Sequence, residues 1–151
     1  MLKIILQSTH PVVPFNEPAR DLRIQNKPLW LAQRDALAPF ATREMELPPN
    51  GRLPQTREAC LVYRDNLWFD EFYIRAFLAE AVKRKRASRA ALSINDPAFR
   101  EHCLPLSNSY TPAGELYLAD LWYYPNGPEP EADPLVIDLQ AREIGYYHVP
   151  T

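Results

Sequence analysis

The chain has 151 residues, of which 46% are hydrophobic, 24% are charged and 11% are aromatic, and its formal net charge is −2. These values are typical of one globular domain with a single core, and they exclude a disordered chain or one with a membrane span of about 20 apolar residues. The small net charge also argues against a dedicated nucleic-acid or anionic-membrane binder.

The predicted elements of the first half alternate between strand and helix. Residues 2–6 form a nearly continuous apolar run, typical of a strand buried on both faces. Residues 8–28 contain four prolines and are expected to be irregular, and apolar positions recur at helical spacing from Leu29 onward. Residues 41–58 are predicted to form a loop, and residues 59–63 a second buried strand.

The second half begins with the strongest predicted helix. Residues 70–86 have a broad apolar face, with acidic residues in the first turn and basic residues in the last, which complements the helix dipole. We interpret the basic run Lys83–Arg86 as a solvated helix end rather than a nucleic-acid site. Further strands are predicted at residues 88–94, 115–124, 135–139 and 145–149, and a short helix at residues 96–101.

This order of elements favours an α/β fold with a Rossmann-like, mostly parallel sheet and crossover helices. The last third contains strands without helices between them, so we expect antiparallel C-terminal strands at the sheet edge. A single domain over residues 1–151 accounts for the whole pattern. Cys60 and Cys103 are too few for a disulfide framework, and the first residues lack the features of a secretory signal, so we expect a cytoplasmic location.

Ligands of open α/β sheets bind at the carboxyl ends of the strands, which here are followed by residues 8–27 and the turn at residues 64–66. A phosphate-binding loop after the first strand needs glycines, because backbone amides must approach the phosphate closely. Residues 8–16 contain no glycine and two prolines. We therefore expect no backbone phosphate cradle at this position.

The opening of the chain resembles that of sugar-phosphate nucleotidyltransferases. A strand at Leu2–Leu6 precedes the segments Pro14–Pro18 and Asp21–Leu29, the latter with a Lys-Pro-Leu sequence that leads into a helix. Cys60–Leu67 is similar to the later strand whose end holds the metal in that family. The likeness covers about residues 2–95 and is closest to divergent relatives of the bifunctional N-acetylglucosamine-1-phosphate uridylyltransferase, in which such a domain precedes a left-handed β-helix of acyltransferase character.

The resemblance implies roles for four residues. Lys27 matches the lysine of the Lys-Pro-Leu segment and would contact phosphate, Asp65 matches the metal-binding aspartate, and Arg20 or Arg23 stands near the position of the loop arginine. The residues alone also allow simpler interpretations. Asp65 then belongs to a strand-end turn in which it bonds nearby backbone amides, and Lys27 is part of the lead-in to a helix.

The sequence departs from the family pattern where catalysis needs it, since the Gly-rich loop is missing and Arg64 replaces the glycine before Asp65. A second metal carboxylate would have to come from Asp120 or Asp138. Phosphoryl transfer depends on backbone donors and cations that neutralise charge. We therefore expect a degenerate, non-catalytic binding or assembly module. The alternatives are an active Mg²⁺-dependent nucleotidyltransferase that uses Asp65 and Lys27, and an unrelated protein–protein interaction domain.

Aromatic residues are concentrated near the C-terminus, namely Trp122, Tyr123, Tyr124, Tyr146 and Tyr147. They form either an interface, because Trp and Tyr give large contact areas at low entropic cost, or a sheet face packed beneath a helix. The interface interpretation predicts a homo-oligomer or a partner domain of acyltransferase type, with no nucleic acid and no membrane as partner.

Overall fold

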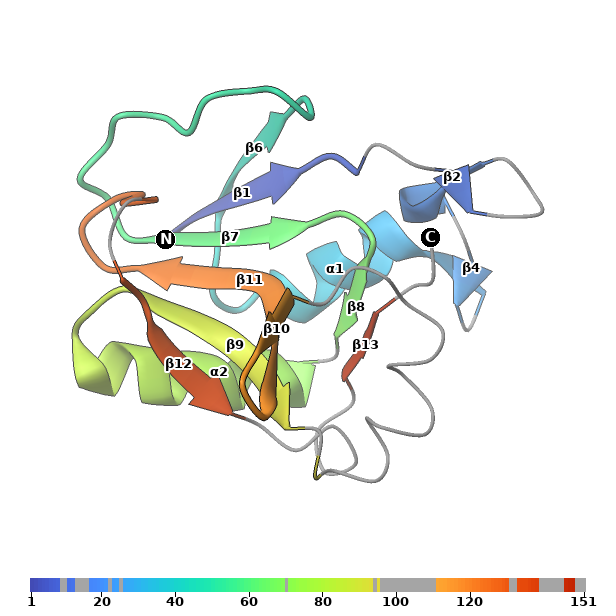
Figure 1. The fold of residues 1–151 in the computed structure, drawn as a ribbon. Coiled ribbons are helices and arrows are strands. Elements are labelled where there is room, and N and C mark those ends of the chain that lie inside the picture. The colour runs from blue at the N-terminus through green and yellow to red at the C-terminus, as the bar shows by residue number, and fades with distance from the viewer. Residues whose placement is uncertain are drawn as a thin grey trace.

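A computed structural model describes residues 1–8, 11–12, 17–21, 23–24, 26–69, 71–93, 95, 111–130, 133–138 and 146–148. Its centre is a seven-stranded sheet with the order β12-β9-β11-β7-β1-β6, to which β10 is added through β11 (Figure 1). The strands are β1 (Leu2–Leu6), β6 (Arg43–Leu47), β7 (Cys60–Arg64), β9 (Ser88–Ser93), β10 (Thr111–Ala113), β11 (Leu116–Tyr124) and β12 (Leu135–Asp138).

The helices of the described residues are the 3-10 turn η1 (Ala19–Asp21), α1 (Leu29–Leu37) and α2 (Glu71–Arg84). None of the helices in these ranges is long and apolar enough to cross a membrane. Three small ladders complete the described structure: β2 (Pro11–Val12) with β3 (Glu17–Pro18), β4 (Arg23–Ile24) with β5 (Lys27–Pro28), and β8 (Leu67–Phe69) with β13 (Tyr146–His148).

The direction of β11 distinguishes it from its neighbours in the sheet. β1 pairs in parallel with β6 and β7, and β12 pairs in parallel with β9, whereas β11 runs antiparallel to both β7 and β9. The expected α/β class with a mostly parallel sheet is confirmed. The reversed strand, however, lies inside the sheet and not at its edge, and its register with β9 shifts between Leu118 and Trp122.

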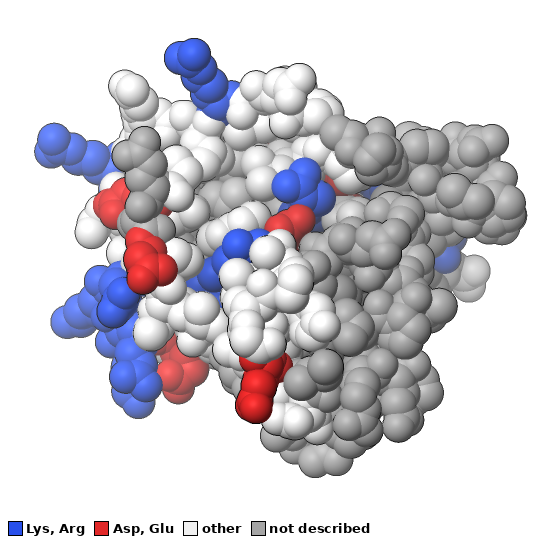
Figure 2. Space-filling model, in the orientation of Figure 1, with Lys and Arg blue, Asp and Glu red and all other residues white. Residues whose placement is uncertain are grey.

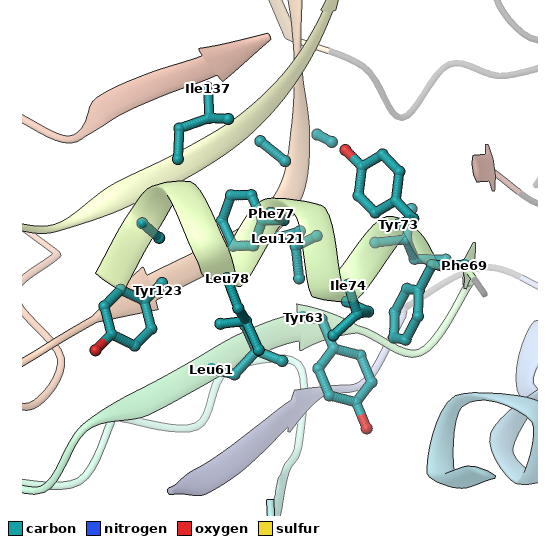
Figure 3. Close-up of a cluster of buried hydrophobic side chains, with 14 of the residues drawn as sticks. Leu61, Tyr63, Phe69, Tyr73, Ile74, Phe77, Leu78, Leu121, Tyr123 and Ile137 are labelled. Atoms are coloured by element: carbon teal, nitrogen blue, oxygen red, sulfur yellow. The ribbon is translucent and has the colours of Figure 1, made fainter. Parts of the chain in front are cut away.

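Both helices lie on one face of the sheet and enclose the larger core (Figures 1 and 3). The apolar face of α2 packs against side chains that β7, β9 and β11 direct toward it. The Tyr63 and Phe69 rings meet edge to face, with centroids 5.5 Å apart. The largest buried side chains of this core are Leu37, Leu61, Tyr63, Leu67, Phe69, Tyr73, Ile74, Phe77 and Leu92, each less than 2% exposed.

The opposite face of the sheet carries a smaller apolar cluster, formed by Leu2, Ile4, Cys60, Val62 and Tyr124. Leu53, from the connection between β6 and β7, packs against this cluster. The crossover between two parallel strands of one sheet is usually an α-helix. Here residues 48–59 make that crossover as a loop with three prolines, so this face has a thinner cover than the helix side.

The expected strands at residues 2–6, 59–63, 88–94, 115–124, 135–139 and 145–149 and both long helices are confirmed, with small shifts at their ends. The prediction of a loop over residues 41–58 is wrong in its first part. Residues 43–47 form the edge strand β6, which pairs with β1 although four of its five residues are exposed. The helix expected at residues 96–101 lies outside the described residues.

Candidate functional site

The turn after β7 lies beside the end of β1, at the carboxyl edge of the parallel strands. Leu6 and Arg64 are partners in the β1–β7 register, and Asp65 follows directly. The backbone amide of Asp65 donates to the carbonyl of Leu6 at 2.9 Å, and the Asp65 Oδ1 accepts from the amide of Ser8 at 2.9 Å. Asp65 is only 4% exposed. Its side chain thus fastens the segment after β1 to the end of β7, as expected for a strand-end turn aspartate.

A buried glutamine of α1 holds the same turn from the helix side. Gln33 is 1% exposed, and its Nε2 donates to the carbonyls of Leu67 at 2.6 Å and Arg64 at 3.3 Å. A buried amide without partners would be unfavourable, so these bonds fix α1 against the turn. Sequence reasoning missed this role because Gln33 occupies a helical position that looks like any other polar one.

Two arginines from β7 and β9 share one aspartate of β11, the strand between them. Arg64 Nε lies 2.7 Å from one carboxylate oxygen of Asp120, and Arg89 Nη2 lies 3.2 Å from the other. Arg89 Nε also donates to the carbonyl of Ala119 at 2.8 Å, where the register of β11 with β9 shifts. The Arg89 guanidinium lies over the Trp122 ring, 4.6 Å from its centroid. We call Arg64, Asp120 and Arg89 the arginine–aspartate cluster. Figure 2 shows one face of the molecule with Lys and Arg in blue and Asp and Glu in red.

These contacts bear directly on the Mg²⁺ ion that an active transferase would need. Mg²⁺ requires octahedral oxygen coordination, with protein carboxylates completed by substrate phosphates and water. The Asp65 Oδ1 is bonded to the Ser8 amide, and Asp120 is held between two guanidiniums. Within the ranges that the structure describes, no group of three or more Asp, Glu, His or Cys residues gathers to hold a metal. In these residues Asp65 thus has a structural partner for one carboxylate oxygen, and a metal role for it stays a prediction; the side chain of Asp138 lies outside them.

The three residues expected to contact phosphate are Lys27, Arg20 and Arg23, and the structure describes each of them in a segment other than the turn that holds Asp65. Lys27, in β5, places its ammonium 2.5 Å from the Asp35 carboxylate of α1, which agrees with a lead-in to the helix. Arg20, in η1, forms an ion pair with Glu46 of β6. Arg23 is exposed in β4. No contact seen among the described residues joins any of the three to Asp65, so a phosphate role for them stays a prediction.

The aromatic residues expected at an interface are divided between the two faces of the sheet, because successive side chains of a strand point to opposite sides. Trp122 and Tyr124 pack with the small cluster on the loop side. Tyr123 is 7% exposed in the helix-side core, so the molecule's own helix covers its ring. Tyr146 and Tyr147 lie in β13, which pairs with β8, and their side chains are outside the description.

Cys60 is the cysteine within the described part of the chain, and it is completely buried. Burial raises the pKa of its thiol, and the nearby Glu58 adds to this effect. Its Sγ lies 3.1 Å from the Glu58 carbonyl, to which the thiol donates. A protonated, inaccessible thiol is a poor nucleophile, so Cys60 is a packing residue.

No protein-family model matches this chain, and no curated protein matches it in sequence. Solved structures do match its fold. A protein from Bacillus anthracis named as a glucose-1-phosphate thymidylyltransferase, in complex with a sucrose, superposes with a TM-score of 0.54 at 13% identity over 83% of this chain and 72% of that chain. A mannose-1-phosphate geranyltransferase from Thermus thermophilus gives a TM-score of 0.51 at 13% identity, with 82% of this chain and 56% of that chain covered.

The class defined by these findings is an α/β domain with a nucleotidyltransferase-like fold. More particularly, the fold is one that this chain shares with the solved thymidylyltransferase and geranyltransferase structures, in agreement with the fold that the resemblance of the opening sequence implies. The chain spans about half the length of the Thermus protein, 56%. A likeness at 13% identity establishes the fold, and fold alone does not establish an activity.

Proposed function

We propose that this chain is a degenerate nucleotidyltransferase-like domain that transfers no nucleotide and acts as a binding or assembly module. The observation that carries the proposal is the use of Asp65. Its carboxylate, which the family resemblance would assign to Mg²⁺, is buried and bonded to the Ser8 amide. A transferase must neutralise phosphate charge with metal and backbone donors, and the glycine-free residues 8–16 are poorly suited to supply such donors.

We also propose, on the sequence alone, a cytoplasmic location and a partner that is either a second copy of this chain or an acyltransferase-type domain. The relation to the bifunctional uridylyltransferase belongs to the same proposal. Sedimentation velocity at increasing protein concentration tests self-assembly. A sedimentation coefficient that rises with concentration supports the homo-oligomer, and a constant monomer value at the highest concentration removes it.

The catalytic question has a direct test. The purified chain is incubated with MgCl₂, each nucleoside triphosphate in turn, and glucose-1-phosphate or N-acetylglucosamine-1-phosphate, while a coupled assay follows pyrophosphate release. We expect no release above that of a sample without protein. Asp65→Asn is the matched variant, because its side-chain oxygen can still accept from the Ser8 amide while its charge is removed. Turnover by the wild type that this variant loses would overturn the proposal and establish the active transferase.

A further inference from the structure

The helix α2 has a second apolar side, which faces solvent. Tyr73, Phe77 and Ala81 are completely buried against the sheet, whereas Phe72 is 73% exposed and Val82 is 53% exposed. These are two of the four exposed large hydrophobic side chains in the described ranges, and they lie on the same helix. Exposed apolar side chains that gather on one face of a protein are typical of an interaction surface.

The exposed side of α2 has the residue spacing of a helix that packs against another helix. Phe72, Arg75, Ala79 and Val82 are separated by three, four and three positions, so they follow one side of the helix. We call these four residues the outer stripe of α2. The small side chain of Ala79 near its middle lets the axis of a second helix come close.

The one charged residue of the outer stripe is Arg75, and its guanidinium has partners beside the stripe. It forms an ion pair with Glu71 and lies 5.4 Å from the centroid of the Phe40 ring, which follows α1 in the chain. The charge is therefore held toward α1, and the methylene groups of Arg75 add apolar surface to the stripe.

We propose that two copies of this chain associate through the outer stripe of α2, with the two helices antiparallel and related by a twofold axis. In this arrangement Phe72 of each copy packs against Val82 of the other, and Arg75 packs against Ala79. The inference rests on the second-copy alternative of the proposed function and assigns a surface to it.

The charges at the two ends of α2 favour both the second copy and the antiparallel direction. The first turn contains Glu71, and the other end contains the basic run Lys83–Arg86. An antiparallel pair places Glu71 of each copy beside Lys85 of the other, at positions that flank the stripe. A parallel pair would place two basic runs side by side, where they repel each other, and would also align the helix dipoles.

The size of the stripe predicts a weak dimer. A helix of 14 residues is about 21 Å long. One pair of such helices buries less area than the roughly 1,200–2,000 Å² of a stable interface, so association should depend on protein concentration.

Sedimentation velocity of the whole chain at concentrations up to about 1 mM tests the surface. We expect the sedimentation coefficient of the wild type to rise with concentration. Phe72→Glu places a carboxylate in the apolar contact and should weaken association at least about tenfold. A negative charge in the first turn of a helix is favourable, so this variant should fold. Met45→Glu is the matched control, because it changes an exposed large hydrophobic residue of β6, and it should associate like the wild type.

The outcomes separate this surface from the broader proposal. Association that is unchanged by Phe72→Glu, or weakened equally by Met45→Glu, would overturn the α2 interface and leave the homo-oligomer standing. A wild type that stays monomeric at the highest concentration would remove both. The pyrophosphate assay is independent of all three results.

Cysteine cross-linking tests the direction of the helices. Phe72→Cys and Val82→Cys are prepared separately in a chain that also carries Cys103→Ser, and Cys60 is buried. After mild oxidation we expect a disulfide-linked dimer in an equal mixture of the two variants and little in either alone. Ten residues of helix, about 15 Å, separate the two like cysteines of an antiparallel pair, too far for a disulfide. Cross-linking within one variant alone, or no dimer in the mixture, would overturn the antiparallel arrangement.

Discussion

The Asp65 carboxylate and the Ser8 backbone amide form a 2.9 Å hydrogen bond between the end of β7 and the residue that follows β1 by two positions. The bond gives a polar, buried side chain a structural duty at the edge of the sheet where α/β proteins hold their ligands. This structural role can be tested separately from metal binding, because the hydrogen bond needs an acceptor oxygen and not a charge.

Replacing Asp65 tests this separation through stability. Asp65→Ala leaves the Ser8 amide without its acceptor in a part-buried position, and we expect it to lower the free energy of unfolding by about 1–3 kcal/mol. Asp65→Asn keeps an acceptor oxygen and should lower it by less than half of that. Urea denaturation of the two variants gives both values. Equal losses would show that the charge of Asp65, and not its acceptor oxygen, is what the fold uses.

The close approach of Gly127 to the Thr56 carbonyl predicts a contrast between two glycines with positive φ. Gly127→Ala places a Cβ against the Thr56 carbonyl, so we expect a loss of about 3 kcal/mol in the free energy of unfolding. Gly114→Ala, in the turn between β10 and β11 at φ of +65°, meets no atom within 4 Å. It should lose only about 1–2 kcal/mol, which is the left-handed backbone penalty alone. Thermal denaturation of both variants measures the contrast, and similar losses would contradict the close approach.

The arginine–aspartate cluster should contribute more than an exposed ion pair does. Asp120→Ala leaves two guanidiniums side by side with 15–30% exposure, and we expect a loss of about 2 kcal/mol, below the roughly 3–5 kcal/mol of fully buried pairs. The matched control is Glu71→Ala, which breaks the exposed Glu71–Arg75 pair of α2 and should lose about 0.5 kcal/mol. If chemical denaturation gives the same loss for both, the cluster has no special role in stability.

Alkaline pH should destabilise the protein through Tyr63. Burial raises its pKa, and the carboxylates of Glu44, Glu46 and Asp65 add to the effect. A phenol whose pKa is raised in the folded protein contributes stability that is complete below the unfolded value of about 10 and is lost as the pH rises toward the folded value. Above a pH of about 10 the free energy of unfolding should therefore fall, with Tyr63 contributing up to about 1.4 kcal/mol per pH unit.

Tyr63→Phe removes the ionisable group while keeping the ring. Urea denaturation between about pH 9 and pH 11, on either side of the ordinary tyrosine pKa, should give a shallower slope for this variant than for the wild type. Tyr123 and Tyr124 also have pKa values raised by burial, so some slope remains in the variant. An unchanged slope would mean that Tyr63 ionises no differently in the folded and unfolded chain.

The elements that the sequence predicts well are those whose local pattern agrees with their final environment. α2 combines a 3.6-residue apolar period with favourable charges at both ends, and β1 and β7 are apolar runs that become central strands. β6 escapes prediction because three of the five residues of the edge strand Arg43–Leu47 are charged and four are exposed. Its partner is β1, and that pairing cannot be seen in five residues of local sequence.

The candidate site is predictable only in part. The turn at Asp65 and its bond to a backbone amide are one of the two interpretations that the residues allow. The arginine–aspartate cluster is not foreseeable, because Asp120 lies 56 residues from Arg64 and 31 residues from Arg89 and meets them only through the strand order. The one signal in the sequence is an aspartate in an otherwise apolar strand. Such an aspartate indicates a neighbouring basic side chain as readily as a metal ion.

β11 runs antiparallel to both of its neighbours, and the arginine–aspartate cluster helps to fix how it is aligned with them. A strand that slides by two residues keeps every side chain on its original face, so hydrophobic patterning alone does not forbid the slide. Such a slide would bring Leu118 or Trp122 to the position between the two arginines and break at least one of the two ion pairs of Asp120. The two ion pairs of Asp120, one to each neighbouring strand, thus select a single alignment of β11 between β7 and β9.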